Sequence, residues 1–304
     1  MNLPNFLPGS QRRWTRRAAV VALCLGLACL AQRWGGGGGG FVGGGEIRVD
    51  EDVKTARDVG TRSVDTPMWT NAPGFDSDVF TFARVRYDKS PTRTWRASGG
   101  WTTDLPDADL NLSYRVQQMT SIRVDPKGRL IRLTDKELSD YPFLFLSAPG
   151  SLYLTDEESD ALRQHLLKGG FLLMDDFHGE REWGNCEQMM AQVFPERKFF
   201  ELPLDHALYH GIYEIKEKIQ ICNVGLGKRH EMGSEITWER EDGKVPHHRG
   251  IQDDKGRLMV LALHNMDTAD GWEREGESDY YFHNFSEKAA YPLGINIIYY
   301  IMTH

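Results

Sequence analysis

Cysteine is scarce in this chain, and its spacing does not match a metal or redox module. Four cysteines occur in 304 residues, and no two of them form a C-x-x-C pair. The common zinc-binding and thiol-redox modules are therefore excluded. Cys24 and Cys29 lie in an apolar N-terminal stretch, which leaves only Cys186 and Cys222 for the rest of the chain. In an oxidising compartment these two could form a disulfide, and two separate buried thiols are the alternative.

Motifs for activated nucleophiles and for nucleotides are also missing. No G-x-S-x-G or G-x-C-x-G sequence occurs, so no nucleophile is presented on a strand-to-helix turn. The glycine run of residues 35–45 follows no expected strand and contains no lysine. It is therefore neither a dinucleotide fingerprint nor a phosphate-binding loop. These patterns predict no cofactor.

Acidic residues are absent from residues 1–34, which hold five arginines. The whole chain carries a formal charge of −8, so the remainder carries about −13. An acidic body repels phosphate backbones, and we therefore expect no nucleic-acid binding.

The N-terminus has the pattern of an export element. Four arginines between residues 12 and 17 precede the apolar stretch AAVVALCLGLACLA, residues 18–31. This order is typical of a signal peptide, with cleavage after Ala31. Trp14 and Trp34 lie about 30 Å apart along a helix, which instead suits an uncleaved signal-anchor. Both readings of residues 1–34 place the rest of the chain outside the cytoplasm. It would be tethered through residues 14–34 on the periplasmic side of the bacterial inner membrane, or released into the periplasm.

Composition divides the remainder into two parts. Residues 35–77 are rich in glycine and polar residues, which predicts a flexible linker. Residues 78–304 alternate apolar strand patterns with helical ones, which predicts an α/β domain with a mostly parallel sheet. Within it the clearest helix follows Thr155, because Glu158 completes a capping box. The expected buried strands include YPFLFLS, FLLMDDF and GRLMVLALHN, with further strands at RKFFELPL and EKIQICNVG, and YPLGINIIYYIMTH is an apolar terminal helix.

Polar residues follow several of these strands, where sites form in parallel sheets. The candidates for acid–base catalysis are Asp175, Asp176, His178 and His264. Ser147, Asn265 and Asp205 are further polar residues of this set. Adjacent residues on a strand point to opposite faces, so Asp175 and Asp176 need not share a site. Structural hydrogen bonding to loop amides is the alternative role for all of them.

One further histidine pair is a candidate metal site. His206 and His210 have the spacing of metal ligands on a helix, but Pro203 and Gly211 make a helix doubtful there. An ordered loop is the alternative. His247 and His248 are expected in an exposed loop.

Four segments carry a family resemblance. They are YPFLFLSAPGSLYLTDEESDALRQHLLKGGFLLMDDFHG, ELPLDHALYHGIYEI, GRLMVLALHNMDTADGWE and YPLGINIIYYIMTH, in this order. From about Thr81 to the end, the chain resembles the bacterial family called domain of unknown function 4159. The resemblance implies a flavodoxin-like, three-layer α/β sandwich similar to class I glutamine amidotransferases, in proteins that are often exported or membrane-anchored. The amidotransferase cysteine has no counterpart here, so the likeness is one of fold and transfers no catalytic residue.

Two functional hypotheses follow. The first is a non-enzymatic, membrane-tethered accessory or scaffolding subunit that docks on an extracytoplasmic membrane protein complex. Tryptophans that look exposed in sequence favour it, because aromatic residues are enriched at interfaces; they are Trp69, Trp95, Trp101, Trp238 and Trp272. The alternative is a hydrolase-like or carbohydrate-binding enzyme built from the Asp and His residues at the strand ends.

Overall fold

The computed structural model describes residues 47–63, 66–74, 78–91 and 99–304. The predicted N-terminal helix and the glycine run lie outside these residues. In the part that is described, no helix combines the length and the apolar character needed to cross a membrane.

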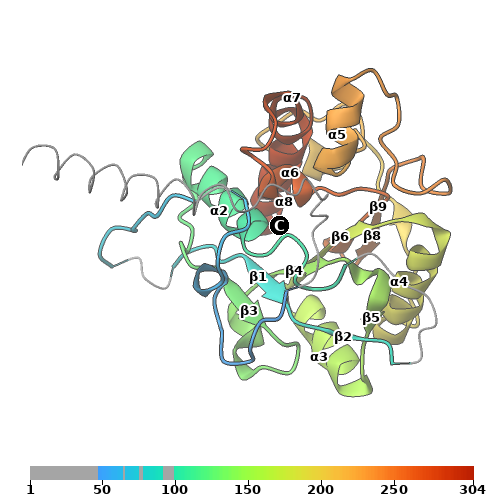
Figure 1. Cartoon of the computed structure of the whole chain (residues 1–304). Coiled ribbons are helices and arrows are strands. Elements are labelled where there is room, and N and C mark those ends of the chain that lie inside the picture. Colours follow the sequence, from blue (N-terminus) through green and yellow to red (C-terminus); the bar gives the residue numbers. More distant parts are fainter. Residues whose placement is uncertain (1–46, 64–65, 75–77, 92–98) are drawn as a thin grey trace, which may run out of the picture. The chain divides into compact units, whose positions relative to one another are not determined.

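A seven-stranded sheet forms the centre of the domain, with strand order β3-β1-β4-β6-β9-β8-β7 (Figure 1). Its strands are β1 (Ala83–Val85), β3 (Arg129–Ile131), β4 (Phe143–Ser147), β6 (Phe171–Phe177), β7 (Phe200–Glu201), β8 (His247–Gln252) and β9 (Leu258–His264). The first five strands of that order are mutually parallel, whereas β8 runs antiparallel to both β9 and β7. The prediction of a mostly parallel sheet is therefore confirmed. A separate antiparallel pair joins β2 (Asp88–Lys89) to β5 (Leu152–Tyr153).

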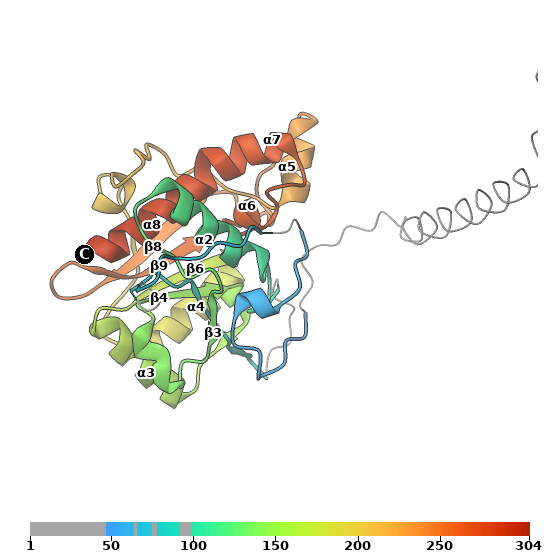
Figure 2. The same cartoon turned by 90° about the vertical axis from the view of Figure 1, so that its left-hand side faces the viewer.

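Helices cover both faces of the sheet, which makes three layers (Figure 2). One face carries α2 (Asp107–Met119), α5 (Val224–Glu231), α6 (Asp270–Glu273), α7 (Asp279–Tyr281), the π-helix η5 (Phe282–Ala290) and α8 (Tyr291–Thr303). The other carries α3 (Asp156–Leu167) and α4 (Gly179–Val193). Short 3-10 turns complete the described part: η1 (Ala56–Asp58), η2 (Lys136–Asp140), η3 (Pro149–Ser151) and η4 (Ala207–Tyr209).

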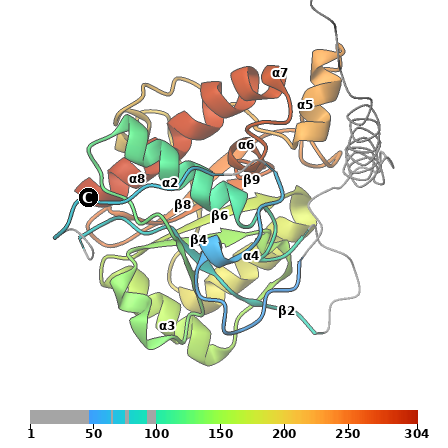
Figure 3. The same cartoon turned by 60° about the vertical axis from the view of Figure 1, so that its left-hand side comes forward.

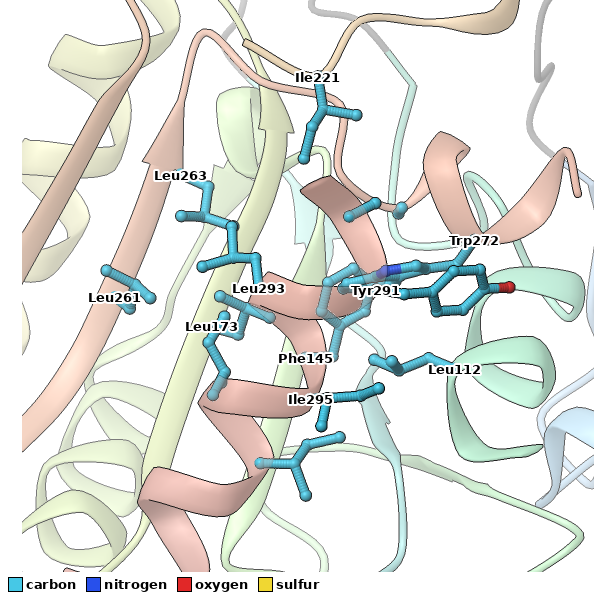
Figure 4. Packing of buried hydrophobic residues seen from close by; sticks show 14 of the residues in the cluster. Leu112, Phe145, Leu173, Ile221, Leu261, Leu263, Trp272, Tyr291, Leu293 and Ile295 are labelled. Atoms are coloured by element: carbon cyan, nitrogen blue, oxygen red, sulfur yellow. The ribbon is translucent and has the colours of Figure 1, made fainter. Parts of the chain in front are cut away.

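The alternation of the buried strands separates two cores. Phe143 and Phe145 of β4 enter the core under α2 and α8, whereas the intervening Leu144 enters the core under α3 and α4. In the first core, Trp272 of α6 packs among side chains of the sheet, α2 and α8 (Figure 4). Trp272 is fully buried there, so it is not one of the interface aromatics.

The two cysteines of the domain are buried in different cores. Cys186 lies in the core under α4, and Cys222 lies in the core on the opposite face of the sheet. The sheet lies between them in the structure, and no disulfide joins Cys186 to Cys222 there.

The capping box predicted from the sequence is confirmed, whereas two other local predictions are wrong. Helix α3 begins after Thr155, whose side chain accepts the Glu158 amide while Glu158 bonds back to the Thr155 amide. Residues 217–225, expected as a strand, contain no strand, because Asn223 caps α5 and the helix begins at Val224. His247 and His248, expected in an exposed loop, lie in β8, because pairing with β9 places His248 opposite Leu263 and buries it.

Parts of the segment assigned to the linker contact the domain. Ala56 is buried, and the guanidinium of Arg57 donates to the carbonyl oxygens of Thr66 and Pro126. The Trp69 indole donates to the carbonyl oxygen of Val124 at 3.0 Å. Packing against the domain therefore begins before residue 78.

Candidate functional site

The chain changes direction in the sheet between β1 and β4. From β1 it passes through α2 to β3 on one side, and then crosses to β4 on the other. In open parallel sheets, ligands bind at such a switch point, beyond the carboxyl ends of the strands. Loops that follow these strands contact one another there, since Ser147 Oγ donates to the carbonyl oxygen of Thr103 and the Thr268 amide donates to Asp175 Oδ1. Helices α2 and α6 are neighbours (Figure 3).

Three buried aspartates converge at this edge, and we call them the acidic cluster: Asp104, Asp267 and Asp270. Asp104 lies in the loop before α2, whereas Asp267 and Asp270 follow β9. One carboxylate oxygen of each lies within 4.8 Å of the other two. Their exposures are 2 %, 6 % and 5 %. Oxygen donors alone, from carboxylates, are the ligand set that suits hard divalent cations.

Asp175 holds the loop that carries two of these aspartates. Its carboxylate oxygens accept the amides of Thr268 at 3.2 Å and Ala269 at 2.7 Å. Burial raises the pKa of Asp175 to about 7, while the bonds from these amides oppose the rise. Asp175 thus bonds to loop amides, the alternative role considered for it from the sequence. The two residues that it bonds, Thr268 and Ala269, lie between Asp267 and Asp270 in the chain.

The arginine that contacts the acidic cluster, Arg274, also contacts two other carboxylates. Arg274 Nε lies 3.3 Å from an oxygen of Asp270 and 2.8 Å from Glu273, and Arg274 Nη1 lies 2.8 Å from Glu277. Neither Asp104 nor Asp267 makes an ion pair with another described residue. Burial, followed by repulsion from neighbouring carboxylates, raises the pKa of Asp104 and of Asp267.

Two carboxylates here have oxygens without a hydrogen-bond donor among the described residues. They are Oδ2 of Asp104 and both oxygens of Glu273, which Arg274 contacts without hydrogen-bond geometry. The side chain of Glu273 is fully buried and lies beside Asp104. Burial, and then the charge of Asp104, raises the pKa of Glu273. A buried polar atom without a partner is costly, so such atoms call for an explanation.

Asp176 and His178 lie between this edge of the sheet and Glu239, which lines a surface hollow. Asp176 has a φ of 60°, at an irregularity of β6 between Met174 and Phe177. His178 Nε2 lies 3.4 Å from Asp176 Oδ1 and 3.6 Å from Glu239 Oε2. Burial, and then the charge of Asp104, raises the pKa of Asp176. Glu239 lines a polar hollow of about 270 Å³ together with Asn223, Arg229 and Trp238.

His264 is placed apart from this group. Its Nε2 lies 3.1 Å from the carbonyl oxygen of Gly179, and Arg249 lies 3.1 Å from its Nδ1. Its ring stacks on Phe177. Burial lowers the pKa of His264 to about 3, so it remains neutral and structural. The structure therefore brings Asp176 and His178 together and uses Asp175 and His264 in bonds to the backbone.

His206 and His210 do not form a ligand pair. His206 Nδ1 accepts the amide of Leu208 at 3.2 Å. Both ring nitrogens of His210 are engaged, with Glu214 at 2.9 Å and the carbonyl oxygen of Leu204 at 2.8 Å. The intervening residues form the 3-10 turn η4 instead of an α-helix, which removes the geometry that spacing of four requires.

A second hollow lies on the α8 side of the domain. This apolar groove has a volume of about 430 Å³, and Ile215, Ile219 and Leu293 are among its apolar lining residues. Charged residues of both signs also line it; they are Glu214, Lys216, Glu217, Glu287 and Lys288. Tyr299 of α8 is 37 % exposed, and Ile212, whose amide donates to Asn296 of α8, is 41 % exposed.

Sequence reasoning missed the acidic cluster and Glu273. The motif DTADGWE directly after a predicted strand is a signal for three of these residues, Asp267, Asp270 and Glu273. Asp104 has no comparable signal, because its loop is distant in sequence from that motif.

Comparison with known proteins gives a family and no described activity. The family described as Domain of unknown function (DUF4159) matches residues 81–302. No curated protein matches the chain. The matched residues span most of the chain and contain the sheet from β1 to β9, both hollows and the acidic cluster. This chain therefore belongs to the family of the domain of unknown function DUF4159.

Proposed function

We propose that the protein is a non-enzymatic accessory or scaffolding subunit that docks on an extracytoplasmic membrane protein complex. Residues 14–34 would tether it to the periplasmic side of the inner membrane, or cleavage after Ala31 would release it into the periplasm. The observation that supports docking is the apolar groove beside α8.

The groove has the composition of a protein-binding surface. Apolar side chains line it together with charged side chains of both signs. Protein interfaces combine an apolar centre with a polar rim in this way. Tyr299 of α8 and Ile212, which is hydrogen-bonded to α8, are further exposed apolar side chains. The occupant that fits is an apolar segment of a partner protein with mixed charges at its edges.

The fold inferred from the resemblance is flavodoxin-like and similar to class I glutamine amidotransferases. The five parallel strands, in the order β3-β1-β4-β6-β9, agree with this inference. A shared fold does not carry activity with it. Cys222 is not an activated thiol, because burial raises its pKa to about 12.

The docking proposal is tested with the full chain in detergent-solubilised membranes. Affinity purification should recover a stable complex, and Ile219→Asp should reduce the recovered partner by about tenfold, because it places a charge in the groove. Ile236→Asp is the matched control, since Ile236 is 42 % exposed and lines the other hollow. Recovery of the wild-type protein only as a free monomer would contradict docking. The intact mass of the same sample reports cleavage after Ala31.

A second candidate is the hydrolase-like or carbohydrate-binding enzyme with an Asp/His site at the strand ends. The contact of His178 with both Asp176 and Glu239 favours it, because Glu239 lines a surface hollow. Asp176→Asn should then abolish turnover or binding in a screen of glycosides and esters, while the groove variant Ile219→Asp retains it. No difference between wild type and Asp176→Asn for any substrate would reject this candidate.

A further inference from the structure

We infer that the acidic cluster of Asp104, Asp267 and Asp270 binds one hard divalent cation, of the class of Ca²⁺, Mg²⁺ or Mn²⁺. One oxygen from each residue lies within 4.8 Å of the others. Such cations contact oxygen at about 2.0–2.6 Å, so a single ion between the three carboxylates reaches all of them.

The ligand oxygens are positioned by contacts outside the acidic cluster. Asp175 fixes the turn at Thr268 and Ala269, between the two aspartates that follow β9. The amide of Val224 donates to Asp270 Oδ2 at 2.5 Å. The loop before Asp104 is held by Arg84, which donates to the carbonyl oxygen of Thr103 at 2.6 Å. Such outer contacts orient the ligands of a metal site.

Nearby arginines do not neutralise this group of carboxylates. Arg84 is matched by Asp109 in a fully buried ion pair. Arg274 is shared among Asp270, Glu273 and Glu277. Asp104 and Asp267 therefore make no ion pair in the part of the chain that the structure describes, although the charges of Arg84 and Arg274 still act on Asp104. Buried charges are normally paired or coordinate a metal.

Glu273 gives an independent indication of a ligand. It is not one of the three converging residues, yet its fully buried carboxyl lies beside Asp104. No N–H or hydroxyl group of a described residue donates to its oxygens or to Oδ2 of Asp104. Its carboxyl instead contacts the carboxyls of Asp104 and Asp270, so acidic groups meet there without a neutral donor between them. Arg274 is 2.8 Å from one Glu273 oxygen and is also shared with Asp270 and Glu277, so a cation at the acidic cluster would add positive charge to a group of carboxylates that outnumbers its arginine.

The polar hollow beside Glu239 is linked to the acidic cluster through two consecutive residues. Asn223 lines this hollow and donates to Glu239 Oε1 at 2.6 Å, and the next residue, Val224, donates to Asp270. The backbone at Asn223 and Val224 thus joins the wall of the hollow to the acidic cluster. A bound cation would cross-link the loop before α2 to the loop after β9.

The test measures cation binding by the full chain after EDTA treatment and dialysis at pH 7.5. Titration with MnCl₂, followed by electron paramagnetic resonance, should show one bound Mn²⁺ per chain. Asp104→Asn and Asp267→Asn should each weaken binding by about tenfold or more, because each removes a charged ligand. Asp205→Asn is the matched control, since Asp205 is exposed and lies outside the acidic cluster. Displacement of Mn²⁺ by CaCl₂ or by MgCl₂ identifies the preferred ion.

Three outcomes would overturn the inference. They are the absence of Mn²⁺ uptake up to about 1 mM, where weak extracellular calcium modules already bind, equal affinity in Asp104→Asn and wild type, and loss of binding in the Asp205 control. Wild-type crystals soaked in MnCl₂ give a readout that does not depend on any variant. An anomalous peak between the three aspartates is expected, and no peak, or a peak elsewhere only, rejects the site.

Discussion

The Ala269 amide donates to Asp175 Oδ2 at 2.7 Å and so joins the end of β6 to the loop that follows β9. Thr268 makes the companion bond at 3.2 Å. The two bonds fix the backbone between Asp267 and Asp270, so the geometry of the acidic cluster depends on a residue outside it.

Asp175→Ala should therefore destabilise the protein by about 3 kcal/mol, because two buried amides lose their acceptor. Chemical denaturation measures the free energy of unfolding. Asp205→Ala, at an exposed position, should change it by less than about 0.5 kcal/mol. Equal stability of the two variants would show that Asp175 does not hold the loop.

The buried pair of Arg84 and Asp109 gives a second prediction. Arg84 Nε lies 3.0 Å from both oxygens of Asp109, and neither side chain is exposed. Arg84→Met should cost about 3–5 kcal/mol, because it leaves a buried carboxylate without its partner. The double variant Arg84→Met/Asp109→Leu should recover most of that loss. A double variant as unstable as the single one would contradict this account.

Two glycines within helices should respond to alanine in opposite directions. A Cβ at Gly294 of α8 would lie 2.8 Å from Trp272 and 2.9 Å from Leu112, so Gly294→Ala should destabilise by about 1–3 kcal/mol. Gly184 of α4 has no atom within 4 Å of such a Cβ. Gly184→Ala should stabilise by about 1 kcal/mol through helix propensity. Melting temperatures of the two variants, measured side by side, check both signs.

His248 should contribute to a loss of stability in acid. Burial lowers its pKa to about 3, below its ordinary value of 6.5. Between these values the unfolded chain binds a proton that the folded protein does not, so the stability due to neutral His248 is present above pH 6.5 and declines as pH falls. The slope approaches about 1.4 kcal/mol per pH unit.

His248→Gln tests this dependence. The variant should be less stable than wild type at pH 7.5, because it alters the contact with the Tyr209 hydroxyl at 2.8 Å. Its deficit should shrink by about 2 kcal/mol at pH 5, since glutamine does not titrate. A deficit that is constant between the two pH values would mean that His248 is not held neutral.

Sequence alone determined the elements whose signals are local. Patterns of neighbouring residues predicted three kinds of element. They are the capping box at Thr155, the continuous apolar strands β4, β6 and β9, and the apolar terminal helix α8. Such patterns are reliable because capping, strand burial and helix amphipathicity act over a few residues. Alternating strand and helix signals also predicted the mostly parallel sheet.

Only the tertiary structure decided the site. Asp104, just before α2, meets Asp267 and Asp270 because α2 packs against α6, and no local pattern encodes that contact. The same holds for His248, which is buried because β8 pairs with β9. Burial and electrostatic environment arise from contacts between residues far apart in the chain, so they follow from the assembled sheet and not from the residues taken singly.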